Sequence, residues 1–288
     1  MTIKELLLNE MAIDKSGKIE LKYYAFDIDD NLFKMPTKIK AINKLTKNRE
    51  ELTTEEFAIA RTQPDKYSFD DQSFSDFRPE GDKKFLEDIV NAQKMPAFID
   101  FEECVRNGGI FAIITARGHS PKVLKEGLKK IIKKEGMESD LIDSLKKHYE
   151  KSKNKKEKTD DKLLNEYFDD FCRYYPVSYP GPVSGLPMIS DTTAANPEER
   201  KKIALEDFIG HVTGLARMLE IDLKKEKIKV GFSDDDEKNV ITAIKFFQDY
   251  EKNLKKTNTI DDLYNDYEFT VKKTDGMKSD IKYKSGIK

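Results

Sequence analysis

The side chains best suited to chemistry in this 288-residue chain are acidic residues that directly follow an apolar run. Residues 23–26 are apolar or aromatic, and Asp27 and Asp29 come next with one residue between them. Two carboxylates at the mouth of a buried strand repel each other and are poorly solvated unless a cation or a hydrogen-bonding loop compensates them. A divalent metal ion is the simplest compensation, so this segment predicts a metal site.

Two further apolar runs end in residues that suit the same chemistry. Residues 110–114 are followed by Thr115 and Ala116, where a hydroxyl and adjacent backbone N–H groups could hold a phosphoryl oxygen. Residues 228–232 lead into the acidic stretch 234–236, whose oxygen atoms are ligands that magnesium prefers. We therefore expect an anion site after the second run and acidic ligands after the third.

Arg117 and His119 follow Thr115 closely and could reach a substrate. We nevertheless interpret them as a surface arginine and a turn histidine, the more common roles of such residues.

The first of these segments, YYAFDIDDNL at residues 23–32, resembles the first motif of the haloacid dehalogenase (HAD) superfamily, an apolar strand followed by DxDx[T/V]. The resemblance implies that Asp27 is a nucleophile that forms an aspartyl-phosphate. It also implies that Asp29 protonates the leaving oxygen and later activates water. Asn31 stands where the family usually has Thr or Val. Because the side chain at this position is not the nucleophile, we expect the difference to alter the geometry of the site more than its activity.

The remaining motifs of that family have counterparts in the family's order. Thr115 and Ala116 match the phosphate-binding second motif. The third motif is a lysine, assigned to Lys202 because apolar residues follow it at helical spacing, with Lys201 as the near alternative.

The segment 231–240 is similar to the fourth motif, in which a pair of aspartates precedes an asparagine and an apolar helix. The resemblance places Mg²⁺ on Asp27, Asp29 through its backbone carbonyl, and Asp234, with Asp235 as the second acidic ligand. Another alignment of this motif would favour Asp235 or Asp236 over Asp234.

The elements that must position these residues repeat in the order strand, polar turn, helix. Ser120 followed by Pro121 predicts a helix start, Gly136 can end that helix, and Asn196 with Pro197 predicts the start of another. This order predicts an α/β fold, a doubly wound, Rossmann-like parallel sheet with helices on both faces. The ligand site is then expected at the carboxyl ends of the strands.

Two segments interrupt this pattern. We expect an HAD-like core formed by residues 1–32, 98–136 and 188–288. Residues 33–97 are read as an insertion after the first motif, and residues 137–187 as an insertion between the second and third motifs. Either could be a cap over the site. In the second insertion the lysine-rich loop 151–158 is expected to be solvated, and Tyr174, Tyr175 and Tyr179 to help select the substrate.

Composition narrows the partners. Lys plus Arg total 52 against 54 for Asp plus Glu, so the net charge of −2 predicts no general attraction to nucleic acid or to anionic membrane. Two cysteines without metal-ligand spacing indicate neither a disulfide framework nor a zinc site. The absence of a long apolar stretch leads us to expect a soluble, cytoplasmic protein without a membrane partner.

Together these features predict a magnesium-dependent phosphomonoesterase that acts on a phosphorylated small molecule. Two alternatives stay open. One is a nucleic-acid end phosphatase, for which the lysine-rich and tyrosine-rich segments could supply charge and stacking. The other is a non-catalytic HAD-fold binding or regulatory protein.

Overall fold

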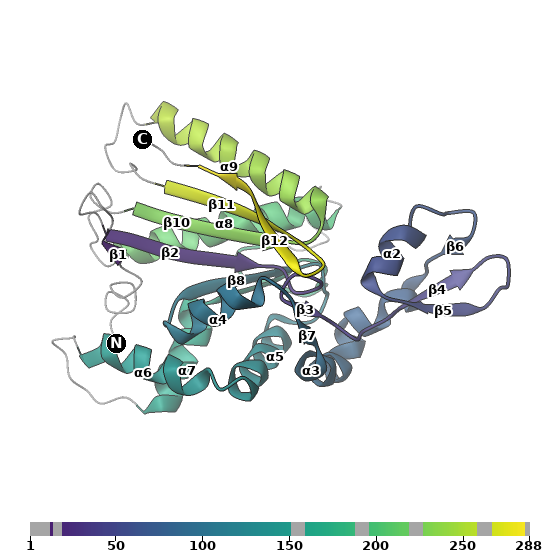
Figure 1. Cartoon of the computed structure of the whole chain (residues 1–288), viewed down its shortest axis with the longest axis horizontal. Helices are drawn as coiled ribbons and strands as arrows, with labels where there is room; N and C mark the ends of the chain where they lie inside the picture. Colours follow the sequence, from purple (N-terminus) through teal and green to yellow (C-terminus); the bar gives the residue numbers. More distant parts are fainter. Residues whose placement is uncertain are drawn as a thin grey trace.

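The main sheet is mostly parallel and forms the centre of the molecule (Figure 1). The computed structural model describes residues 12–13, 19–150, 159–187, 196–218, 227–257 and 267–285. The strands run in the order β12-β11-β10-β2-β8-β9, and β1 pairs with β2. Neighbours from β11 to β9 are parallel, whereas β12 and β1 are antiparallel to their partners. The strands are β1 Ala12–Ile13, β2 Ile19–Phe26, β8 Ile110–Thr115, β9 Arg173–Pro176, β10 Lys227–Asp234, β11 Tyr267–Asp275 and β12 Lys278–Lys284.

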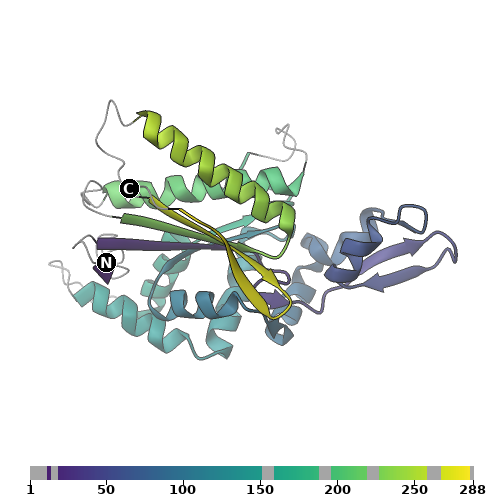
Figure 2. The same cartoon turned by 45° about the horizontal axis from the view of Figure 1, so that its top comes forward.

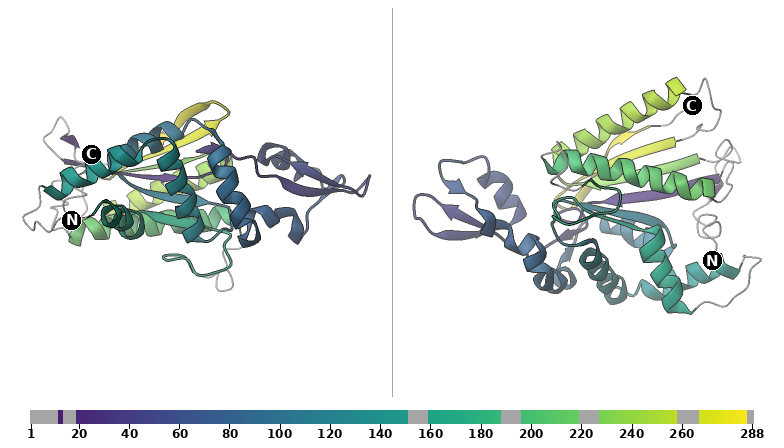
Figure 3. Two further views of the ribbon diagram at one scale, coloured as in Figure 1. Left: turned by 90° about the horizontal axis from the view of Figure 1, so that it is seen from below. Right: turned by 180° about the vertical axis from the view of Figure 1, so that it is seen from behind.

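Helices cover both faces of this sheet (Figures 1 and 3). The helices α8 (Pro197–Met218) and α9 (Glu237–Thr257) lie on one face, and α4 (Phe98–Arg106) and α5 (Pro121–Lys134) on the other. Right-handed crossovers require this arrangement, because the chain winds outward from β2 in one direction through β8 and β9 and in the other through β10 and β11. The predicted α/β class with a mostly parallel sheet is confirmed, and the arrangement is compatible with a Rossmann-like fold.

The three apolar runs became central strands of the sheet, and β8 is covered on both faces, whereas β2 and β10 alternate between buried residues and half-buried ones such as Lys22 and Lys229. All six residues of β8 are buried. Phe26 and Phe111 pack edge-on against Phe101 of α4, with ring centroids 5.7 Å and 5.3 Å away. Each such buried aromatic or aliphatic side chain stabilises the fold by about 1.5–3 kcal/mol relative to exposure. The strand ends that carry the polar residues are therefore held rigidly.

The predicted helix boundaries agree with the local chemistry. The Ser120 side chain accepts a hydrogen bond from the N–H of Val123, and Pro121 is the first residue of α5. Gly136 follows that helix with φ of +65°, a conformation that suits glycine. The Asn196 side chain accepts from the N–H of Glu199 at the start of α8. These caps fix where each helix leaves the strand end before it.

Residues 39–81, which we call the lobe, project from one end of the sheet (Figures 1 and 2). The pair β3 (Phe33–Lys34) and β7 (Gln93–Lys94) precedes and follows it. The lobe has its own three-stranded sheet and a small core of Ala41, Leu52 and Ala60. Its elements are β4 Ile39–Asn43, β5 Arg49–Leu52, α2 Thr54–Ala60, β6 Tyr67–Ser68, η1 Asp71–Phe77 and η2 Pro79–Gly81.

The predicted insertion 33–97 is thus only partly separate from the core. After the lobe, α3 (Asp82–Asn91) returns and packs against α5. Phe85 and Ile89 of α3 are fully buried there. The polar composition of residues 33–97 hid this apolar stripe from the sequence pattern.

Residues 137–187 are not an insertion, and that prediction is wrong. This segment forms α6 (Glu138–Glu150), α7 (Asp160–Glu166), the π-helical turn η3 (Tyr167–Phe171) and β9, which pairs in parallel with β8. The short strand ends in a proline, which an edge strand tolerates, and this made it resemble a loop. Tyr174 and Tyr175 are buried in the core. The loop 151–158 lies outside the described residues.

Within the described ranges, no helix combines the length and the apolar character required to cross a bilayer.

Candidate active site

The polar ends of the central strands meet at one edge of the sheet. Asp27 directly follows β2, Thr115 ends β8 and Asp234 ends β10. The Asp27 N–H donates to the carbonyl of Ser233 at 3.0 Å. The Asn31 amide donates to the Asp27 carbonyl and to Ser233 Oγ, each at 3.0 Å. Asn31 therefore ties the first and third of these strand ends together, which gives the unusual residue of the first motif a structural role.

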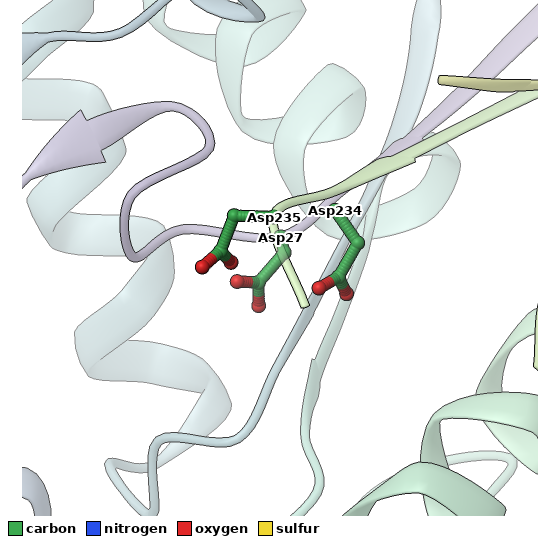
Figure 4. Close-up of side chains that lie close together, drawn as sticks. All are labelled: Asp27, Asp234 and Asp235. Carbon is green, nitrogen blue, oxygen red and sulfur yellow. The ribbon is translucent and has the colours of Figure 1, made fainter. Parts of the chain in front are cut away.

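Three carboxylates converge at this edge (Figure 4). Asp27, Asp234 and Asp235 each offer a ligand oxygen, and these atoms lie within 4.8 Å of one another. Asp27 is 4% exposed and Asp234 is fully buried. Burial raises the pKa of Asp27, with Lys201 opposing the shift and Asp234 adding to it. Burial and the charges of Asp27 and Asp234 also raise the pKa of Asp235. The cluster thus carries more negative charge than its surroundings stabilise.

Lys201, rather than Lys202, reaches this cluster. Lys201 Nζ lies 2.7 Å from Asp234 Oδ2 and 3.0 Å from Asp27 Oδ1. Burial alone would lower the pKa of Lys201, but the two carboxylates raise it above its ordinary value. Lys202 is more than a third exposed and pairs with Glu199. One residue along a helix turns the side chain by about 100°, so the alternative lysine, not the first choice, faces the site.

Asp234 and Asp235 have different surroundings. Asp234 Oδ2 accepts from Lys201, and Asp234 Oδ1 accepts from the Asn239 amide at 2.9 Å and the Asp236 N–H at 3.0 Å. Both oxygens of Asp234 are therefore occupied by the protein. The carboxylate of Asp235 has no hydrogen bond or ion pair with any described residue, and it lines the adjacent cavity. Asp235 is thus the less engaged of the two carboxylates, whereas the sequence-based order put Asp234 first.

A divalent cation fits this donor set. Asp27 Oδ1 is buried without a hydrogen-bond partner among the described residues, because the nearby Lys201 ammonium approaches it outside hydrogen-bonding geometry. A buried carboxylate oxygen whose hydrogen-bonding capacity is not used is destabilising by about 1–3 kcal/mol. Asp235 has no ion pair with a described residue, and carboxylate oxygens suit Mg²⁺. The predicted ligands Asp27 and Asp235 thus meet the requirements of a small hard cation.

The second motif sits beside the cluster. Thr115 is fully buried, and its Oγ1 accepts from the Arg117 N–H at 3.3 Å. The neighbouring Ala116, Arg117 and Gly118 line the cavity, but Thr115 does not. The turn after β8 therefore presents backbone to the cavity and keeps the predicted threonine behind it.

Asp29 has a partner that the sequence did not reveal. Its Oδ1 accepts from Arg117 Nη2 at 2.7 Å and its Oδ2 from Arg117 Nε at 2.8 Å, and Arg117 is 1% exposed. His119 is also fully buried and lies 2.8 Å from Asp82 through Nδ1. The interpretation of Arg117 and His119 as ordinary surface residues is wrong. Only their position after a strand end hinted at this.

An open cavity of about 610 Å³ separates the carboxylates from the lobe. Residues of the core edge form its floor, and residues of the lobe form its opposite wall. The lobe wall includes Ile39, Phe57, Arg61, Phe74, Phe77 and Arg78. Ser178 is the cavity residue contributed by the segment 137–187. The lobe, which belongs to the first of the two proposed insertions, is therefore the part that overhangs the site.

Comparisons with protein-family models, with curated proteins and with solved structures found no match for this chain.

Proposed function

We propose that this protein is a magnesium-dependent phosphomonoesterase of the HAD type, with Asp27 as nucleophile. The observation that carries the proposal is the buried Asp27 carboxylate at a strand end, held beside the buried cation Lys201 and the unpaired carboxylate of Asp235. A carboxylate kept partly free of partners, next to a fixed positive charge and an open cavity, suits attack on a phosphoryl group.

The reaction proceeds in two displacements at phosphorus. An oxygen of Asp27 bonds to phosphorus as the bond to the leaving oxygen breaks, and protonated Asp29 gives its proton to that oxygen. Water then attacks the phosphorus of the aspartyl-phosphate. Asp29, now ionised, takes a proton from the water, and the bond from Asp27 to phosphorus breaks. Inorganic phosphate leaves and both side chains return to their starting state.

The surrounding residues offset the negative charge that gathers in this reaction. Lys201 offsets the charge of Asp27 and would lie close to the oxygens of a phosphoryl group that Asp27 attacks. The backbone at Ala116 and Gly118 borders the same cavity. Asp27, Asp235 and the Asp29 backbone carbonyl would hold Mg²⁺, which supplies additional positive charge to the phosphoryl group. Asp234 orients Lys201, and each of its oxygens already accepts at least one hydrogen bond from the protein.

The lobe wall favours a small organic phosphate with a flat, apolar body. Phe57, Phe74 and Phe77 are each half-buried and border the cavity. Ligand pockets are commonly lined by aromatic side chains of this kind with few polar groups among them. The nucleic-acid alternative loses part of its support, because Tyr174 and Tyr175 are buried in the core and cannot stack on bases.

The experiment is a rate measurement with p-nitrophenyl phosphate, with and without Mg²⁺. We expect chelation to remove activity and Mg²⁺ to restore it. Asp27→Asn should lower kcat by about a thousandfold or more, as loss of a nucleophile does. Asp71→Asn is the matched control, since the Asp71 side chain is fully exposed on the lobe. A comparable rate in Asp27→Asn contradicts the nucleophile assignment. A folded wild type that turns over no phosphate ester supports the non-catalytic alternative.

A further inference from the structure

Arg117 is the most deeply buried charged side chain in contact with the cavity. It is 1% exposed, and its guanidinium donates hydrogen bonds to both carboxylate oxygens of Asp29 at 2.7 Å and 2.8 Å. The Phe77 and Phe85 rings lie against that guanidinium, with centroids 4.6 Å and 5.2 Å from Cζ. A planar fork that meets a carboxylate at two points fixes the carboxylate's direction, which a single contact does not.

The other contacts of Arg117 lie on the two connections between core and lobe. Arg117 Nη2 donates to Thr37 Oγ1 at 3.2 Å, and Thr37 in turn donates to Asp88 Oδ2 at 2.7 Å. Thr37 precedes β4, where the chain enters the lobe. Phe77 is the last residue of η1, a few residues before the chain leaves the lobe. Arg117 therefore touches Asp29 and both connections at once.

The turn that carries Arg117 is itself fixed to the lobe. The Gly118 N–H donates to the Phe77 carbonyl at 2.7 Å. A side chain at position 118 would place its Cβ 2.9 Å from the Ser178 carbonyl oxygen, closer than such atoms approach. His119 Nε2 lies 3.4 Å from Arg117 Nη1, and His119 Nδ1 lies 2.8 Å from Asp82 at the start of α3. A shift of the lobe relative to the core therefore moves the partners of Arg117.

We propose that Arg117 is a positioning residue that aims the Asp29 carboxylate for hydrolysis of the phosphoenzyme and makes that step depend on the placement of the lobe. The inference rests on the proposed function, because it assigns Asp29 to the second displacement. In that step the ionised carboxylate takes a proton from the attacking water, and a carboxylate turned away leaves the water unactivated. Arg117 itself touches neither phosphorus nor water in this assignment.

A defect confined to the second step has a recognisable kinetic signature. With p-nitrophenyl phosphate the leaving group departs without a proton, so the first displacement does not depend on Asp29. Slowing only the second step lowers kcat and KM together and leaves kcat/KM nearly unchanged. The phosphoenzyme then accumulates during turnover. General loss of structure has neither effect.

The test compares Arg117→Lys, Asp29→Asn and their double variant in Mg²⁺ with p-nitrophenyl phosphate. Arg117→Lys keeps the positive charge but cannot donate two parallel hydrogen bonds to the Asp29 carboxylate. We expect it to lower kcat by about tenfold or more, to leave kcat/KM nearly unchanged, and to raise the fraction of phosphoenzyme in acid-quenched samples weighed by mass spectrometry. The double variant should be no slower than Asp29→Asn alone, because both changes remove one function.

Arg49→Lys is the matched control, since the Arg49 guanidinium also donates to both oxygens of an aspartate, Asp70, but on the surface of the lobe. It should retain the wild-type kinetics. If Arg117→Lys does not fold, Thr37→Val replaces it in the test, because it removes the hydroxyl that accepts from Arg117. We expect the same pattern in kcat, kcat/KM and phosphoenzyme, with a smaller loss of kcat.

Equal losses of kcat and kcat/KM without accumulated phosphoenzyme overturn the positioning role. Additive losses in the double variant overturn it as well. A wild type that hydrolyses no phosphate ester is a different result, and it removes the proposed function together with this inference.

Discussion

Replacing Lys201 with methionine should destabilise the fold far more than the same change at Lys202. Lys201 lies 2.7 Å and 3.0 Å from two buried carboxylates. At an effective dielectric constant of about 20, each contact is worth roughly 5–6 kcal/mol of Coulomb energy. The desolvation of the three buried charges offsets most of this sum. Removing one partner of a buried ion pair nevertheless costs about 3–5 kcal/mol, because the remaining charges lose their compensation.

Lys202 provides the matched control on the same helix. Its pair with Glu199 is solvent-exposed on both sides, so Lys202→Met should cost at most about 1 kcal/mol. Urea unfolding followed by circular dichroism measures both changes, and an unchanged slope with urea shows that the comparison is valid. The loss in Lys201→Met should shrink in mildly acidic buffer, where Asp27 takes up a proton more readily. Similar costs for the two variants, or a larger cost for Lys202→Met, would refute the assignment of Lys201 to the site.

Three further predictions follow from the contacts of the site and core. Asp235→Asn should raise the Mg²⁺ concentration needed for half-maximal hydrolysis by about tenfold or more, as expected for loss of a direct ligand. Asp236→Asn should raise that concentration much less. The reverse order in a magnesium titration would contradict the ligand assignment. Burial and Arg173 lower the pKa of His211 from 6.5 to about 4. Between these values the unfolded chain binds a proton at His211 that the folded chain does not, so this histidine alone should lower stability by about 2.5 kcal/mol as pH drops from 6.5 to 4. His211→Gln should flatten that part of the profile in urea unfolding at several pH values. Phe74→Ala should raise KM for benzyl phosphate more than KM for ethyl phosphate, because Phe74 borders the cavity. Ile59→Ala is the control, since Ile59 is exposed on the lobe, and it should change neither KM. Equal increases of KM for both substrates in Phe74→Ala would argue against an aromatic site.

The sequence was sufficient for features that depend on local pattern. The three apolar runs predicted β2, β8 and β10, and the reason is clearest in β8, where a strand buried on both faces must be apolar throughout. Ser120 and Asn196 marked helix starts correctly, since capping needs only a few adjacent residues. The convergence of Asp27 with residues 234 and 235 followed from the parallel arrangement of strand ends.

The sequence was insufficient where contacts between distant segments decide. Choosing between Lys201 and Lys202 requires the rotation of α8 about its axis, and the apolar residues near them left that rotation uncertain by one position. The fork between Arg117 and Asp29 joins residues 88 positions apart and has no local signal. The strand β9 was missed because it is short and ends in proline at the sheet edge.

The most direct measurement of the central claim is the position of the phosphoryl group during turnover. Asp29→Asn, incubated with p-nitrophenyl phosphate and Mg²⁺ and quenched in acid, should form the aspartyl-phosphate and hydrolyse it slowly. Peptide mass spectrometry is predicted to find one added phosphoryl group, on the peptide that contains Asp27, and to find none when Mg²⁺ is chelated. A wild type that hydrolyses the substrate while no adduct forms on Asp27, or a phosphoryl group on another residue, would contradict the proposed mechanism.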